Sequence, residues 1–257
     1  MAMMIRRGLF IAGAKSSPEL RAGVRDCEKL HAVLQREEFG GFAPDLSAPL
    51  LTECACPIEY LGALREFIER SASASHRVIY FTGHGRVASG HYGLEFDGQF
   101  LPFGAVTGML QGQGPARTLF ILDTCHSGAA DLGGIKAGEL PIEPGGSAIF
   151  ASSRDVQLSH EDEQIGSAFT HFLCECIESG NGGIPTTGSL ITVPDAIGYI
   201  KRRIEETNRA LQNPIYTARH AETHLWIARN ISAAPSTGTA LVKLVTSDDP
   251  FAAPCSG

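Results

Sequence analysis

Short apolar runs and helical apolar stripes alternate along this 257-residue chain. Segments built around continuous apolar runs, typical of strands that are buried on both faces of a sheet, occupy 8–14, 77–83, 117–123 and 147–151. Apolar residues recur at helical spacing over 26–38, 57–71, 166–178 and 193–208. Strands that alternate with helices predict an α/β fold, with a mostly parallel central sheet of about six strands flanked by helices on both faces.

Two shorter patterns complete the predicted chain path. Asp97 and Gly98 lie between two short apolar runs, which is the signature of a two-residue β-hairpin. A strand that closes the sheet is expected near 224–228. We therefore predict one domain over 1–230, followed by a C-terminal edge strand and a flexible tail over 231–257.

The composition narrows the class of partner. With 43% hydrophobic and 19% charged residues, the chain has the make-up of an ordinary globular protein. No apolar run approaches the roughly 20 residues that span a bilayer, so no membrane span is expected. The net charge of −7 argues against nucleic acid as a partner, because phosphate binding needs a basic surface. A basic peptide remains compatible with this charge.

Cysteine use and the N-terminal segment bear on the compartment. The seven cysteines follow no regular disulfide framework, which favours a reducing cytoplasm over secretion. Arg6 and Arg7 followed by 8–14 imitate a short signal peptide. That apolar stretch is at the lower limit of about 7 residues for the apolar region of a signal peptide. The fold also needs the same segment as its first strand. We therefore predict a cytoplasmic protein.

Two residues with catalytic chemistry follow buried strands. His84 comes directly after the run 77–83, and Cys125 comes just after the run 117–123. Carboxyl ends of parallel strands meet at one edge of a sheet, and a base from another part of the chain can activate a thiol there. We therefore predict that Cys125 and His84 form a catalytic pair. His126 is a rival base, but a neighbour along an extended chain points to the opposite side.

The sequences around this pair are YFTGHG, which ends at Gly85, and LDTCHSG around Cys125. Together they resemble the motifs of caspases, metacaspases and their bacterial relatives, and the likeness extends over roughly 8–229. The resemblance implies a caspase-like fold and a cysteine endopeptidase with His84 and Cys125 as its catalytic dyad. It also implies that the backbone N–H groups of Gly85 and Cys125 form the oxyanion hole.

The resemblance further implies which substrates are cut. Caspases that cut after aspartate carry an arginine in the first loop and a glutamine two residues before the cysteine, where this chain has Leu20 and Asp123. Metacaspases have an aspartate in that loop, a serine two residues before the histidine and an aspartate two residues before the cysteine. Asp26, Thr82 and Asp123 occupy these positions, with threonine in place of serine. Ser152, in the segment similar to the substrate-flanking strand, is a further candidate.

These residues predict cleavage after arginine or lysine, because paired carboxylates attract a cation and repel an acidic side chain. Two alternatives stay open at this point. In the first, Asp26 is an ordinary helix N-cap. In the second, the chain is an aspartate-specific protease of the same fold. The motif LRAGVRD, which ends at Asp26, has the spacing of the metacaspase Leu-x-Gly-Cys-x-x-Asp loop but departs from it at Ala22 and Gly23.

Metal sites are not expected. Many metacaspases use calcium, but after His84 this chain offers only Glu95 and Asp97, whereas calcium takes six or more oxygen ligands. This argues against calcium dependence, and no other cofactor is indicated. The two Cys-x-Cys pairs, 54–56 and 174–176, lack zinc-finger spacing and are interpreted as structural.

A mode of activation can be predicted from Lys136, and a biological role is implied by the resemblance. Lys136 is the only basic residue in the Gly- and Pro-rich segment 129–146, so it is the candidate processing site of a zymogen. Bacterial relatives act in cell death, defence and signalling cascades, which implies an upstream protease or a regulatory partner. The alternative from another class is a caspase-like pseudoenzyme that serves as a protein-interaction module.

Overall fold

The computed structural model describes residues 5–13, 21–42, 49–124, 146–152, 166–184, 186, 189–207, 214–219 and 225–232. Its strands are β1 (Arg6–Gly13), β2 (Leu50–Leu51), β3 (His76–Ala88), β4 (His91–Phe96), β5 (Gln99–Pro102), β6 (Arg117–Thr124), β7 (Ser147–Ala151), β8 (Leu190–Thr192), β9 (Ile215–Arg219) and β10 (Trp226–Arg229). Its α-helices are α1 (Arg21–Gln35), α2 (Pro57–Arg70), α3 (Phe103–Gly108), α4 (Ala168–Glu178) and α5 (Val193–Glu206).

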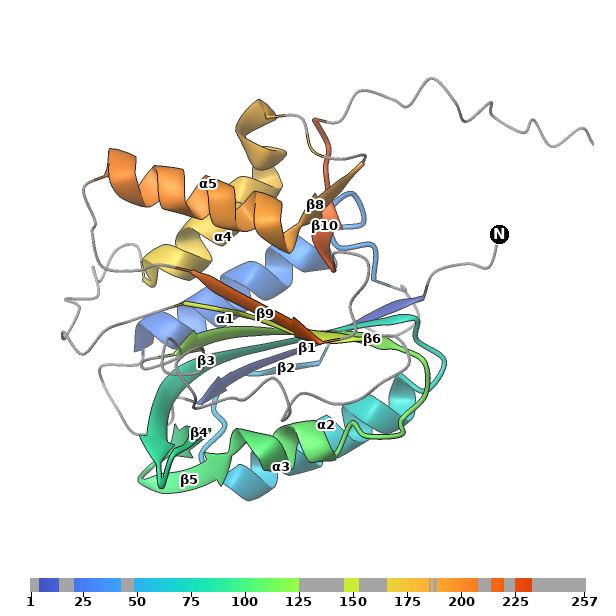
Figure 1. Cartoon of the computed structure of the whole chain (residues 1–257), viewed down its shortest axis with the longest axis vertical. Helices are drawn as coiled ribbons and strands as arrows, with labels where there is room; N and C mark the ends of the chain where they lie inside the picture. The colour runs from blue at the N-terminus through green and yellow to red at the C-terminus, as the bar shows by residue number, and fades with distance from the viewer. Residues whose placement is uncertain are drawn as a thin grey trace, which may run out of the picture.

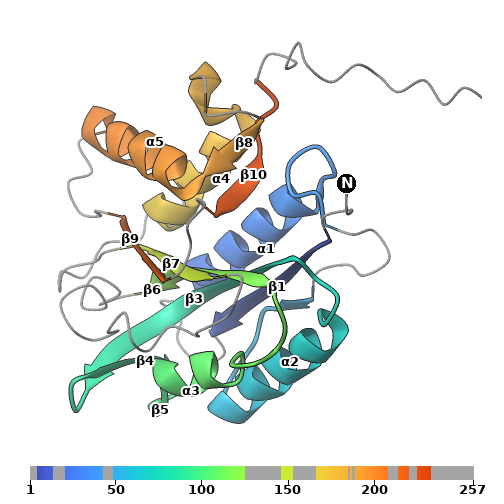
Figure 2. The same cartoon turned by 45° about the vertical axis from the view of Figure 1, so that its right-hand side comes forward.

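The central sheet has the strand order β2-β1-β3-β6-β7-β9, and the hairpin β4-β5 extends from β3. The contacts from β2 through β7 are parallel, and β9 runs antiparallel to β7. Helices α1, α4 and α5 cover one face, while α2 and α3 cover the other (Figures 1 and 2). The predicted α/β fold with a mostly parallel sheet between two helical layers is therefore confirmed.

The sheet separates two apolar layers, as alternation along its strands requires. In β1, Phe10 and Ala12 pack into the layer that contains α1, α4 and α5. Leu9 and Ile11 pack into the opposite layer, with α2 and α3. All four side chains are fully buried, which explains why the segment reads as one continuous apolar run. The segment that imitates a signal peptide is thus an inner strand of the sheet.

The closing strand differs from the prediction. The sequence predicts it near 224–228, but β9 closes the central sheet, and β10 pairs antiparallel with β8 in a separate two-stranded sheet. The apolar side chains of Ile227 and Ala228 pack in the layer with α4 and α5 instead of extending the central sheet. The predicted tail is described only at Ile231 and Ser232, and its predicted edge strand lies outside the described residues.

A buried arginine attaches the small sheet to the large one. Arg6 is 1% exposed, and its guanidinium donates to the carbonyls of Gly40, Trp226 and Ile227. The same group lies 3.9 Å from the centre of the Trp226 ring, a cation–π contact. Carbonyl partners are needed here because a buried charge without hydrogen bonds is strongly destabilising. None of the helices in the described residues combines the length and apolarity needed to cross a membrane.

Candidate active site

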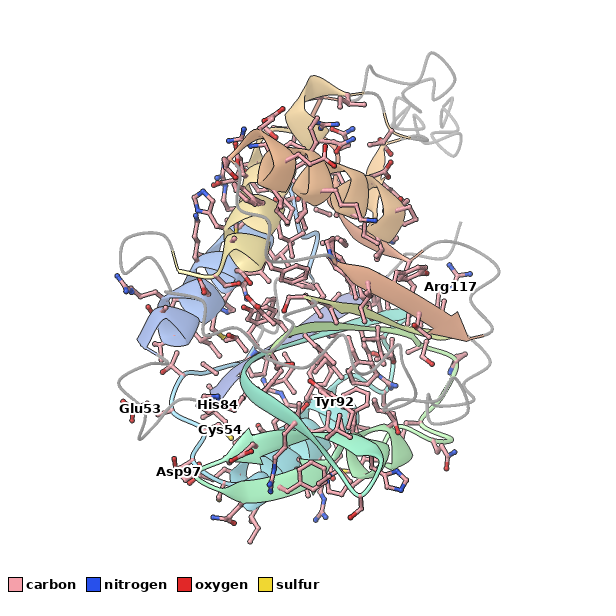
Figure 3. All side chains as sticks on the ribbon, turned by 60° about the vertical axis from the view of Figure 1, so that its left-hand side comes forward. Glu53, Cys54, His84, Tyr92, Asp97 and Arg117 are labelled. Carbon is pink, nitrogen blue, oxygen red and sulfur yellow. The ribbon has the colours of Figure 1, made fainter. Side chains whose placement is uncertain are left out.

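The carboxyl ends of β3 and β6 lie side by side at one edge of the sheet. Their register places Thr82 opposite Asp123 and Gly83 opposite Thr124. Residues opposite each other project to the same face, so the side chains of Thr82 and Asp123 share the face covered by α1 and α4. In Figure 3, the label of His84 marks this edge of the sheet, and Arg117, the first residue of β6, lies at the opposite edge.

Gly83 changes the direction of β3 directly before His84. Its φ is +152°, and a Cβ there would lie 3.0 Å from the ring of Phe81 and 3.3 Å from the carbonyl oxygen of Gly13. Beyond it, β3 leaves β6 and pairs antiparallel with β4, with His84 opposite Glu95 and Gly85 opposite Leu94. A residue with a side chain would be strained here, so glycine is required where the histidine leaves the sheet.

Asp123 is held by hydroxyl groups from two other elements. Asp123 is 3% exposed. Ser152, just after β7, donates to Oδ1 at 3.0 Å, and Thr170 of α4 donates to Oδ2 at 2.7 Å. Both carboxylate oxygens therefore have a fixed partner, which orients the group at the strand end.

Asp26 reaches the same place from the opposite direction. Helix α1 begins at Arg21, so Asp26 lies inside the helix and is not its N-cap, contrary to the alternative left open by the sequence. Its Oδ2 accepts the N–H of Ser167 at 2.8 Å. Gly166, with φ of +76°, packs so closely that a Cβ would lie 2.3 Å from Oδ1 of Asp26. The backbone of Gly166 and Ser167 thus packs directly against the carboxylate of Asp26.

A second glycine brings α1 onto the strand ends. A Cβ on Gly23 would lie 3.1 Å from Oγ1 of Thr82. Gly23 is one of the positions that depart from the metacaspase pattern, and its missing side chain fits the close approach of α1 to β3. Asp26, Thr82, Asp123 and Ser152 are therefore brought to one edge of the sheet.

Both carboxylates influence the buried phenol of Tyr80. Burial, followed by the charges of Asp123 and Asp26, raises the pKa of Tyr80 well above its usual value. Tyr80 projects to the same face, two residues before Thr82. Both carboxylates therefore lie close enough to Tyr80 to disfavour its ionised form.

The catalytic candidates differ in what the structure describes. Gly85 is buried, and His84 is partly exposed. Within the described part of the chain, no hydrogen bond engages the imidazole of His84. Cys125 and Lys136 lie outside the described residues, as does most of the segment 129–146. Gly83 pairs with Thr124, and the residues that follow these two in the sequence are His84 and Cys125.

Sequence reasoning assigned no role to Thr170, Tyr80 or Tyr92. All three are fully buried, and each makes a hydroxyl contact at this end of the sheet. The hydroxyl oxygen of Tyr92, in β4, lies 2.5 Å from Oγ1 of Thr124. The available signal was a hydroxyl residue within an otherwise apolar run, as at Tyr80 between Ile79 and Phe81.

The described cysteines are free thiols in apolar surroundings, with Cys56 only partly buried. Burial is the first cause that raises the pKa of Cys54, Cys174 and Cys176, each to about 12. Such thiols stay protonated at neutral pH and are poor nucleophiles. Among the described residues, no three His, Cys, Asp or Glu side chains are grouped so that they could hold a metal ion.

Comparison with known proteins decides the family. The family model of the caspase domain matches residues 2–225, which includes both strand ends described above. The chain belongs to the caspase-domain family of cysteine peptidases. No curated protein matches this caspase-domain chain.

Solved caspase structures share the fold. The Drosophila initiator caspase Dronc superposes with a TM-score of 0.60 at 10% sequence identity, covering 87% of this chain and 82% of Dronc. The structure of drICE superposes with a TM-score of 0.52 at 15% identity, covering 83% of this chain and 87% of drICE. At such low identities the likeness concerns the fold alone.

Proposed function

We propose that this caspase-like chain is a cysteine endopeptidase that cleaves peptide bonds after arginine or lysine, with Cys125 as nucleophile and His84 as acid/base. Family membership supports the protease class. The observation that carries the specificity is the convergence of Asp26 and Asp123, both 3% exposed, on one edge of the sheet. A cationic side chain entering beside Thr82 would meet both carboxylates.

The proposed chemistry uses a thiol and an imidazole that each come directly after a strand segment in the sequence: His84 follows Gly83, and Cys125 follows Thr124. His84 accepts the proton of the Cys125 thiol, and the thiolate attacks the carbonyl carbon of the scissile bond. The N–H groups of Gly85 and Cys125 stabilise the developing oxyanion. His84 then returns the proton to the leaving amine, and water hydrolyses the thioester to free the acid and the thiol.

Electrostatics decides between a basic and an acidic residue before the scissile bond. A unit charge about 4 Å from one carboxylate gains or loses about 4 kcal/mol at an effective dielectric of 20, before desolvation is subtracted. A guanidinium gains this from each of Asp26 and Asp123, whereas a carboxylate is repelled by both. Repulsion from both carboxylates also disfavours the aspartate-specific alternative.

The remaining features of the proposal concern regulation. We place the enzyme in the cytoplasm, as an activatable protease without a metal or other cofactor, within a bacterial cell-death, defence or signalling cascade. Lys136 is the proposed processing site, because a protease that cuts after basic residues can act on it. If the Lys136→Ala variant stays intact and fully active, processing at this residue is excluded.

The test of the proposed activity is a panel of fluorogenic peptides that differ only in the residue before the scissile bond. We expect turnover with arginine and lysine, and none with aspartate. The Cys125→Ala and His84→Ala variants should lose it. Absence of turnover with every peptide, from intact protein and from trypsin-treated protein freed of trypsin, would favour the interaction module over the protease.

A further inference from the structure

A chain of three buried hydroxyl and carboxylate groups runs from the core to the strand end of β6. Oγ1 of Thr170 lies 2.7 Å from Oδ2 of Asp123 and 2.9 Å from the hydroxyl oxygen of Tyr80. Tyr80 and Thr170 are fully buried, and Asp123 is 3% exposed. The three residues come from β3, α4 and β6, so their contact joins three separate elements.

The direction of these hydrogen bonds can be assigned from the number of hydrogens. A carboxylate only accepts, so the single hydroxyl hydrogen of Thr170 is donated to Asp123. Oγ1 of Thr170 then accepts from Tyr80, whose raised pKa keeps its hydroxyl protonated. Successive hydroxyls that point the same way polarise one another and strengthen the bond to the carboxylate.

Thr170 lies in the first turn of α4. A threonine hydroxyl in a helix can bond to a carbonyl three or four residues earlier. Here the hydroxyl instead leaves the helix surface and reaches across to the sheet. Together with Ser152 on Oδ1, it fixes the orientation of both carboxylate oxygens.

We infer that Thr170 is a positioning residue that determines specificity, because it holds Asp123 in the orientation that accepts a substrate guanidinium. Tyr80 supports Thr170 from the core side. This inference rests on the proposed function, since it assigns Asp123 to the pocket for a basic side chain. It makes Thr170 act through Asp123 on substrate binding and not on the chemical step.

The test compares four variants on two peptides, one with arginine before the scissile bond and one with citrulline, its uncharged twin. Thr170→Val removes the hydroxyl at constant shape, and Thr170→Ser keeps it. Tyr80→Phe removes the supporting donor. Thr107→Val is the matched control, because Thr107 is also a buried helical threonine but donates to the carbonyl of Gly104 in its own helix, on the other face of the sheet.

The expected result is a change in KM and in discrimination, without a matching change in kcat. Thr170→Val should raise KM for the arginine peptide roughly tenfold, the effect of weakening one hydrogen bond to a charged group. Its preference for arginine over citrulline should fall by a similar factor. Thr170→Ser should restore both quantities, Tyr80→Phe should shift them less in the same direction, and Thr107→Val should leave them unchanged.

Wild-type KM and wild-type discrimination in a folded Thr170→Val would overturn the inference. If that variant does not fold, wild-type values in Tyr80→Phe would overturn it instead. These outcomes are distinct from failure of the proposed function, in which the wild-type protein itself would not cleave the arginine peptide.

Discussion

The hydroxyl oxygen of Tyr92 lies 2.5 Å from Oγ1 of Thr124, and both side chains are buried. Thr124 is the last residue of β6 and directly precedes Cys125 in the sequence. Asp123 is held on one face of the sheet by Ser152 and Thr170, and Thr124 is held on the other face by Tyr92. The end of β6 is thus fixed on both faces of the sheet.

Loss of the Tyr92 hydroxyl should affect the chemical step. In Tyr92→Phe, Thr124 loses this partner, and looser positioning of the adjacent nucleophile should lower kcat roughly tenfold with little change in KM. Tyr60→Phe is the matched control, because the hydroxyl of Tyr60 is buried in the same layer and has no hydrogen-bond partner among the described residues. Steady-state kinetics on an arginine peptide distinguishes the two. Equal kcat in Tyr92→Phe and wild type would contradict this role.

Gly83 should tolerate no side chain. In Gly83→Ala, the new methyl group would meet Phe81 and the backbone of Gly13, at a φ that favours glycine. We expect at least a few kcal/mol lower free energy of unfolding, or a displaced His84 and little activity. Gly62→Ala is the control, since nothing lies within 4 Å of its Cβ position in α2. That change should stabilise the helix by about 1 kcal/mol, as urea unfolding can measure.

Gly166 should control the position of Asp26. In Gly166→Ala, the methyl group would overlap Oδ1 of Asp26, so the carboxylate must move and KM for arginine peptides should rise several-fold. Gly183→Ala separates this effect from backbone strain, because Gly183 also has a positive φ of +75° but has nothing within 4 Å of its Cβ position. Both variants should lose stability, and only Gly166→Ala should lose affinity for basic substrates. The same KM in both would exclude a role for Asp26 in the pocket.

His76 should make the fold sensitive to acid. Burial, and then the charges of Arg6 and Arg117, hold the pKa of His76 well below its ordinary value. Its ring nitrogens have no hydrogen-bond partner among the described residues. The unfolded chain gains a proton below about pH 6.5 that the folded chain does not, so stability is lost as the pH falls through this range.

Through His76, the free energy of unfolding should fall by about 2 kcal/mol between pH 6.5 and pH 5, from the linkage slope of a single group. Urea unfolding of the wild type and of His76→Phe at both pH values measures it. The variant should lose less free energy of unfolding on acidification than the wild type. An identical pH dependence in both proteins would show that His76 is not the group responsible.

Much of the fold follows from local sequence patterns. The runs that end before His84 and Cys125 are continuous and apolar, so their strands β3 and β6 could be predicted, as could the hairpin at Asp97 and Gly98. The error at 224–228 arose because an apolar run does not say which sheet receives it. Trp226 and Ile227 accept hydrogen bonds from Arg6, a contact between opposite ends of the chain that no local pattern reveals.

The site was predictable to the extent that residue types and their order carry it. Asp26, Thr82, Asp123 and Ser152 were identified from a resemblance, and the structure brings them to one edge of the sheet. The supporting hydroxyls were not identified, because the role of Thr170 depends on how α4 packs against β6. The role of Gly166 could not be predicted either, because it depends on the close approach of its backbone to the carboxylate of Asp26.

The most direct test of the central claim is covalent labelling with peptidyl chloromethyl ketones that differ only in their terminal residue, arginine or aspartate. Intact-mass measurement and peptide mapping then locate the adduct. We predict one adduct per chain, on Cys125, with the arginine reagent and none with its aspartate twin. Labelling of Cys125 by the aspartate reagent in preference, or of another cysteine by the arginine reagent, would contradict the account.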